Sequence, residues 1–164
     1  MSLFVDGCSS YALQKELGWF FDPRKLLTFL VEKYFQEPVE LIGAFWYDII
    51  YPKLDRKAFH DALLLMNFTV RLKVAREFVS ENTRYYKVSN LEMELAIDML
   101  NTLNLYNCAV LVSGCFDYDR AIEVLKKNGV YIIMIGSKSK CTKAQIELVD
   151  SFIELKDIKA YIQK

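Results

Sequence analysis

The sequence predicts an α/β fold in which helices cover a mostly parallel sheet. Short apolar runs typical of buried strands alternate along the chain with amphipathic stretches of roughly 10 to 15 residues. Strands separated in this way form βαβ units, whose strands run parallel because the chain crosses back over the sheet each time. The chain has 164 residues, of which 53% are hydrophobic, enough for one substantial core. We therefore expect a single domain spanning residues 1–164.

Local sequence patterns in the first part of the chain predict three helices and two strands. An apolar run at 3–5 precedes Asp6, and the pair Asp22 and Pro23 starts a helix because Asp caps and Pro suits the first turn. We expect His60 to be a partly exposed surface or boundary residue of the helix that carries Phe59. The expected elements are a strand at 3–5, a helix at 11–17, a helix from 22 to before Pro38, a strand at 39–50 and a helix at 56–66.

The second part continues the alternation after one exposed region. Residues 68–74 alternate apolar and polar side chains, as a half-exposed strand does, and 84–88 are expected to pair back on them across 80–82. The further elements are a helix at 91–103, a strand at 108–112, a helix at 119–127, a strand at 130–135, a helix at 143–148, a short strand at 152–155 and a helical turn at 158–162.

Charge and cysteine content restrict the class of protein. Lys plus Arg and Asp plus Glu each number 21, so no overall positive field indicates a nucleic-acid partner, although local basic patches remain open. The chain contains one histidine and no CxxC pair, so no zinc pattern can be completed. We expect reduced thiols in a cytoplasmic protein. Since no basic leader and no run of 18 apolar residues is present, we expect neither secretion nor a membrane span.

Acidic residues follow two of the expected strands. Asp6 follows the first strand, and Asp117 follows the strand 108–112 within "LVSGCFDYDRAI". The carboxyl ends of parallel strands share one edge of the sheet, which is where such folds bind ligands. Glu92 and Asp98 lie on the helix that also starts at this edge, about 120° apart around it, so we do not expect one ion to contact both directly. Several carboxylates together indicate Mg²⁺ or Mn²⁺.

Five segments together resemble the NYN branch of the PIN-like nuclease superfamily. "LFVDGCSSY" is similar to that family's opening hydrophobic-Asp-Gly-Ser-Asn segment, and "LEMELAIDML" to its Val-Asp-x-x-Leu-Ala-x-Asp-Met helix. "AVLVSGCFDY" is similar to its Val-Ser-Gly-Asp-x-Asp-Phe strand end, and "RKAFHDALLLMNFTVRLKV" and "ELVDSFIEL" fit further segments. The resemblance implies a three-layer α/β/α PIN-like fold, an acidic metal site and action on RNA.

The resemblance also assigns roles to individual residues. It implies that Asp6, Asp98 and Asp117 are catalytic and that these three bind the metal together with Glu92, which stands where Asp is usual. Cys115 stands where the family has another Asp, and Ser9 where it has Asn. A neutral thiol is a poor ligand for Mg²⁺, which prefers oxygen. The acidic site is therefore eroded or rebuilt.

Two functions follow from this reading. The first is a divalent-metal-dependent ribonuclease that hydrolyses RNA phosphodiester bonds at the acidic site. The alternative is a catalytically impaired NYN-like domain that binds RNA or a protein partner, and the replacements at Cys115 and Ser9 distinguish the two.

Basic and aromatic residues suggest the partners. Basic side chains bind phosphates, and aromatic rings stack on unstacked bases, so the two together suit RNA. The alternative is that these basic residues form the solvent-exposed face of an edge hairpin, where they discourage aggregation. The predicted RNA contacts are Arg71, Lys73, Arg84, Lys87, Lys138 and Lys140. A further group of aromatic residues exceeds what one core needs and suggests a homodimer face; these are Trp19, Phe20, Phe21, Trp46 and Tyr47.

Overall fold

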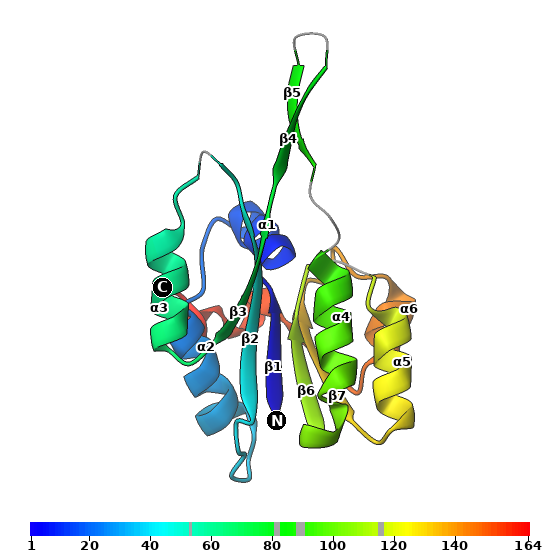
Figure 1. Ribbon diagram of the computed structural model, residues 1–164. Coiled ribbons are helices and arrows are strands. Elements are labelled where there is room, and N and C mark those ends of the chain that lie inside the picture. Colours follow the sequence, from blue (N-terminus) through cyan, green and yellow to red (C-terminus); the bar gives the residue numbers. More distant parts are fainter. Residues whose placement is uncertain (53, 81–82, 88–90, 115–116) are drawn as a thin grey trace.

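A six-stranded parallel sheet forms the centre of the protein. The computed structural model describes residues 1–52, 54–80, 83–87, 91–114 and 117–164 (Figure 1). The strands follow the order β3-β2-β1-β6-β7-β8, and every neighbouring pair is parallel, as predicted. Their bounds are β1 Ser2–Asp6, β2 Gly43–Ile50, β3 Thr69–Val74, β6 Cys108–Val112, β7 Tyr131–Gly136 and β8 Ser151–Glu154.

The strand order defines where a ligand is expected. The chain runs outward from β1 through β2 to β3 and then returns to the other side of β1 with β6. Such reversals of strand order are topological switch points, and open α/β sheets bind ligands there, beyond the carboxyl ends of the strands. Asp6 is the last residue of β1, so it lies at this point. We call this side of the sheet the carboxyl edge.

Helices cover both faces of the sheet, which confirms the three-layer α/β/α architecture (Figure 1). One face packs on residues such as Leu13, Leu26 and Leu63, and the other on residues such as Leu95 and Leu125. The first face carries α1 Gly7–Leu17, α2 Pro23–Phe29 with a π-helical turn Leu30–Tyr34, α3 Lys57–Leu65, a 3-10 turn Leu155–Ile158 and α7 Lys159–Ile162. The second carries α4 Leu91–Asn101, α5 Asp119–Lys127 and α6 Lys143–Leu148, and a 3-10 turn Leu103–Leu105 follows α4.

Local sequence signals explain where several helices begin. Asp22 accepts hydrogen bonds from the backbone N–H groups of Arg24 and Lys25, and Pro23 occupies the first turn of α2, as predicted. Thr142 and Gln145 form a capping box at α6, in which each side chain bonds the other's backbone. Asp6 caps α1 through the N–H of Ser9, so this carboxylate serves the fold as well as the carboxyl edge.

A two-stranded hairpin, β4 Arg76–Ser80 and β5 Thr83–Lys87, extends beyond the carboxyl ends of the sheet (Figure 1). The prediction that residues 84–88 pair with 68–74 was wrong, because β3 pairs with β2 instead. The N–H of buried Ala75 donates to the carbonyl of Ile50, and the chain leaves the sheet after this bond. The partner of β5 is therefore the segment that follows β3.

Two predictions of surface position were also wrong. His60 is only 6% exposed because it turns inward to a buried carboxylate described below. The aromatic group Trp19, Phe21, Trp46 and Tyr47 is buried, and only Phe20, at 40% exposure, reaches the surface. These rings fill the layer between the sheet and its helices, so they supply no dimer face. A homodimer therefore stays a prediction without support from these residues.

None of the helices in the described part of the chain is long and apolar enough to cross a membrane.

Candidate functional site

Asp6 forms a polar cluster with the end of β6. Its Oδ1 accepts the N–H of Ser9 at 3.0 Å, and its Oδ2 accepts the hydroxyls of Tyr118 at 2.9 Å and Ser113 at 3.3 Å. The Ser9 hydroxyl lies 3.0 Å from that of Ser113 and accepts the N–H of Gly114 at 3.1 Å. Asp6 is 3% exposed. Its carboxylate is thus enclosed by neutral donors from α1, β6 and the start of α5.

Asp98 is held on the same face of the sheet by a neighbouring tyrosine. Its Oδ2 accepts the hydroxyl of Tyr47 at 2.8 Å and Nε of Arg71 at 3.1 Å. Tyr47 lies on β2 directly beside Asp6 in the strand register. Burial, then the hydrogen bond to Asp98, raises the pKa of Tyr47, so its hydroxyl stays protonated as the donor.

The other predicted acidic residues are more open. Glu92 is half-buried in the first turn of α4, and Asp117 is exposed between β6 and α5. Asp119 accepts Nε2 of Gln145 at 3.3 Å. Cys115, where the family resemblance implies an Asp, lies outside the described residues.

These placements allow a test of whether the residues fit a divalent metal. Within the described ranges, no three His, Cys, Asp or Glu side chains gather closely enough to hold a metal ion. The oxygens of Asp6 already accept O–H and N–H groups, and Asp98 accepts an O–H and a guanidinium. A cation at Asp6 would have to displace those donors. As placed, the carboxylates do not form a centre built from several free anionic oxygens, which a divalent metal needs. The metal-binding role of Asp6, Glu92, Asp98 and Asp117 stays a prediction.

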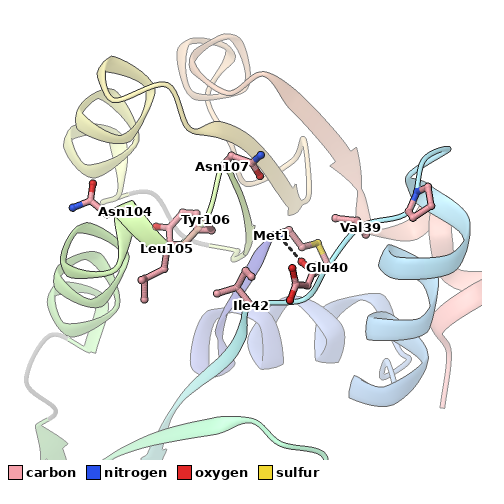
Figure 2. Close-up of a pocket in the computed structure, with 9 residues that line it drawn as sticks. Met1, Val39, Glu40, Ile42, Asn104, Leu105, Tyr106 and Asn107 are labelled. Atoms are coloured by element: carbon pink, nitrogen blue, oxygen red, sulfur yellow. Dashed lines mark hydrogen bonds between the residues drawn. The ribbon is translucent and has the colours of Figure 1, made fainter.

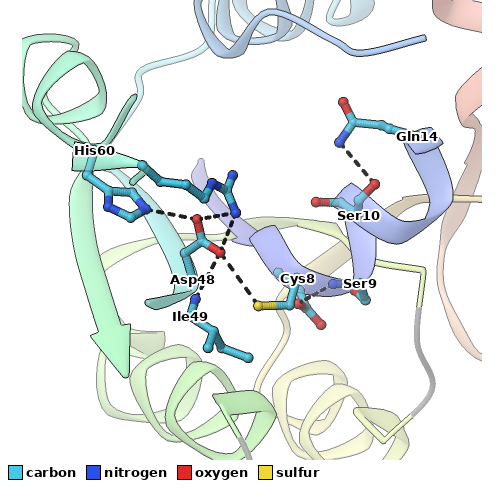
Figure 3. Close-up of polar contacts among 9 residues, drawn as sticks. Cys8, Ser9, Ser10, Gln14, Asp48, Ile49 and His60 are labelled. Carbon is cyan, nitrogen blue, oxygen red and sulfur yellow. Dashed lines mark hydrogen bonds and ion pairs between the residues drawn. The ribbon is translucent and has the colours of Figure 1, made fainter. Parts of the chain in front are cut away.

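A second buried carboxylate, Asp48, was missed by the sequence analysis (Figure 3). It lies near the end of β2, 1% exposed, with Nη1 of Arg56 at 2.9 Å from both oxygens and Nε2 of His60 at 2.9 Å from Oδ2. Oδ1 also accepts the N–H of Ile49 at 2.9 Å and the thiol of Cys8 at 3.6 Å. The available signal was a lone Asp in an apolar strand, followed by Arg and His four residues apart where a helix begins.

Cys8 lies between the two buried carboxylates. Burial raises its pKa, and the negative charges of Asp48 and Asp6 raise it further. The thiol therefore stays protonated and donates to Asp48. This environment opposes a nucleophilic role, which needs the thiolate.

Three of the basic residues predicted to contact RNA pair with acidic neighbours. Arg71 pairs with Asp98, Lys73 with Glu94 at 2.8 Å and Lys140 with Glu16 at 2.8 Å. Lys138 is exposed, and its backbone N–H donates to Glu154. The side chains of Arg84 and Lys87 lie outside the described part of the structure. Solvent-exposed pairs of this kind are weak, so their cations can exchange a carboxylate for a phosphate.

A cavity at the opposite edge of the sheet lies away from these residues. It has a volume of about 510 Å³ and is lined by residues such as Met1, Glu40 and Asn107, at the amino ends of the strands (Figure 2). The N-terminal amine of Met1 donates to the carbonyl of Glu40 across it at 2.6 Å. Two smaller cavities, of about 370 and 270 Å³, share Arg56 as a wall. None of the carboxyl-edge residues described above lines this cavity.

The three-layer fold with its six-stranded parallel sheet is that of a PIN-like domain. The NYN domain family model matches residues 1–156, and the chain belongs to this family.

Two similar proteins extend the comparison. The low amplitude and bright protein LabA of Synechococcus elongatus (strain ATCC 33912 / PCC 7942 / FACHB-805) is 35% identical over 166 residues, which cover 100% of this chain and 88% of LabA. The crystal structure of VPA0982, a protein of unknown function from Vibrio parahaemolyticus RIMD 2210633, superposes with a TM-score of 0.77. That match covers 98% of this chain and 94% of the other at 17% identity, so it supports the fold alone.

Proposed function

We propose that this chain is a single NYN domain that binds single-stranded RNA across its carboxyl edge, with binding rather than hydrolysis as its main activity. The observation that carries the proposal is a pair of stacked rings on the projecting hairpin. Phe78 and Tyr85 face each other across the strands with centroids 5.7 Å apart and planes 15° from parallel. They are 40% and 48% exposed.

An exposed ring pair of this kind suits unpaired bases. A two-stranded hairpin is marginally stable in water, and exposed large apolar groups commonly mark an interaction site. Aromatic side chains stack on unpaired bases of any sequence, and nearby cations contact the phosphates. Exposed Arg76 lies on the same hairpin, and the sequence adds Arg84 and Lys87 to it. The hairpin thus combines both kinds of group that hold a single strand.

The environment of Asp6 favours binding over cleavage. Its carboxylate is enclosed by Ser9, Ser113 and Tyr118, and Cys115 replaces one acidic residue implied by the family resemblance. Both features reduce the anionic oxygen available to a cation at the end of β1.

Fluorescence anisotropy of a labelled single-stranded RNA at low salt tests this proposal. We expect the double substitution Phe78→Ala and Tyr85→Ala to weaken binding by about 1 to 3 kcal/mol per stacked base. Tyr131→Ala is the matched control, since this ring is 48% exposed at the start of β7, at the amino ends of the strands. Absence of RNA binding by the parent chain would contradict the proposal and favour a protein partner.

The second candidate is the metal-dependent ribonuclease, with Mg²⁺ or Mn²⁺ held by Asp6, Glu92, Asp98 and Asp117. The observation in its favour is that Asp6 ends β1 while Asp117 follows β6, the adjacent strand, and Tyr47 links Asp98 to the same face. Calorimetric titration with Mn²⁺ tests this candidate. If it is correct, Asp6→Asn lowers the affinity and Cys115→Asp raises it, whereas unchanged affinity in Asp6→Asn removes Asp6 from any metal site.

A further inference from the structure

Arg56 is a fixed guanidinium in the wall of a cavity. Asp48 engages its Nη1, and its guanidinium carbon lies 5.2 Å from the ring centroid of Tyr11 and 5.1 Å from that of Phe59. The side chain is 20% exposed. Because Asp48 uses Nη1, the other two guanidinium nitrogens provide donors in a fixed orientation.

The cavity beside Arg56 has five aromatic side chains in its lining. It has a volume of about 270 Å³ and lies between α1, α3 and the segment that leads into α2. Phe20 lies 5.5 Å from Tyr11, centroid to centroid, and both rings are 40% exposed at its rim. Buried Trp46 and half-buried Phe59 form further walls, and Gln14, the acidic Asp22 and the basic Lys164 add polar and charged groups. The cavity thus offers flat apolar surfaces beside a guanidinium.

This lining selects the chemistry of the ligand. A purely apolar ligand would cover the Arg56 donors without giving them acceptors, which is unfavourable for a charged group. A nucleobase supplies a flat ring for stacking together with ring nitrogens and carbonyls as acceptors, and its phosphate adds a negative charge near Arg56. The volume lies just below the roughly 300 Å³ at which pockets for drug-sized ligands begin, which suits one base rather than a larger group.

We propose that this cavity is a binding site for a single nucleotide, with the base between the rings of Tyr11, Phe20 and Phe59 and with Arg56 as its polar contact. The inference rests on the proposed RNA-binding function. The cavity adjoins the carboxyl edge, because Gly7, which directly follows Asp6, lines it. The cavity opens on the face of the sheet opposite the Asp6 side chain, so an RNA strand crossing the carboxyl edge would place one base here. A free nucleotide has the same chemistry.

Titration of the full chain with adenosine and uridine 5′-monophosphate tests the site. We expect saturable binding, followed by tryptophan fluorescence because Trp46 lines the cavity, and by calorimetry. Phe20→Ala should weaken it about 5- to 150-fold, the range for losing one base-stacking ring. Phe20 is partly exposed, so its removal is compatible with folding. Tyr131→Ala should leave mononucleotide binding unchanged, because this ring lies at the amino ends of the strands, away from the cavity.

Two further probes separate the sources of the ligand. Ribose 5-phosphate lacks the base, so equal binding of this sugar would overturn the proposal. A single-stranded hexanucleotide that binds at least tenfold more tightly, with the same loss in Phe20→Ala, supports a base within RNA. Equal affinities support a free nucleotide.

Failure of this site and failure of the proposed function give different results. No saturation by any nucleotide, or no effect of Phe20→Ala, overturns the nucleotide site. RNA binding that still depends on Phe78 and Tyr85 would then leave the hairpin proposal standing.

Discussion

Replacing Asp48 by Asn exchanges one side-chain oxygen for a nitrogen. Among substitutions of this kind at the carboxyl edge, we expect it to destabilise the protein most. The carboxylate is 1% exposed and accepts hydrogen bonds from Arg56, His60, Ile49 and Cys8. The amide keeps the shape of the side chain but loses the negative charge and directs two N–H donors at groups that are themselves donors. Arg56 would then be left without its anionic partner.

The magnitude follows from the burial of both partners. Removing one member of a buried ion pair costs about 3 to 5 kcal/mol, because the other charge is left uncompensated. Arg56 keeps 20% exposure and can partly rehydrate, so we expect the lower part of this range, about 3 to 4 kcal/mol. For a chain of this size the midpoint of thermal unfolding falls by about 2 to 4 °C per kcal/mol, which gives about 6 to 16 °C.

Urea denaturation followed by circular dichroism measures the loss. Asp61→Asn is the matched control on α3: Asp61 pairs with Lys57 at 2.7 Å, but the two side chains are 52% and 81% exposed. Water screens such a pair, so this variant should unfold like the parent. A loss below about 1 kcal/mol in Asp48→Asn, typical of an exposed pair, would refute the view that Asp48 organises this part of the fold.

Three further predictions concern Asp6, a buried thiol and the hairpin cations. Tyr118→Phe should cost about 1.5 to 3 kcal/mol in urea denaturation because Asp6 loses a donor, and an equally stable variant would show that this donor is dispensable. Burial raises the pKa of Cys108 from 9.0 to about 11, so its contribution to stability is full below pH 9 and is lost as the pH rises to 11. Cys108→Ala should therefore lose less stability than the parent between these pH values, and equal urea profiles would contradict this. Arg84→Ala with Lys87→Ala should flatten the dependence of log affinity on log salt by about one to one and a half units, measured by anisotropy, if both contact phosphates. An unchanged slope would exclude these cations.

Features set by local sequence could be predicted. The parallel sheet could be predicted from continuous apolar runs such as β1 and β6. Such a run is recognised as a buried strand without knowing which strands lie beside it. Asp22 and Pro23 start α2 through bonds within three residues. The position of Asp6 at a strand end follows from β1 alone, so the acidic edge was also accessible from the sequence.

Features set by distant partners could not. His60 is buried because Asp48, on another element, accepts from its ring. Strand β5 pairs with residues 76–80 because the chain leaves the sheet after the N–H of Ala75 donates to the carbonyl of Ile50. The alternation of apolar and polar residues along the sequence does not indicate this exit. Likewise, Tyr118 reaches Asp6 across 112 residues, so nothing local marked it as a donor.

Asp6 and Asp48 show two ways of keeping a carboxylate buried on adjacent strands. Asp48 faces the cation Arg56, so its charge is balanced and its role is to hold α3 and the guanidinium in place. The described donors to Asp6 are neutral, from Tyr118, Ser113 and Ser9, and dipoles satisfy hydrogen bonds without cancelling charge. An incoming cation at Asp6 would therefore compete with neutral donors that already fit the carboxylate. The proposed RNA-binding function and the metal-dependent alternative differ in the outcome of that competition.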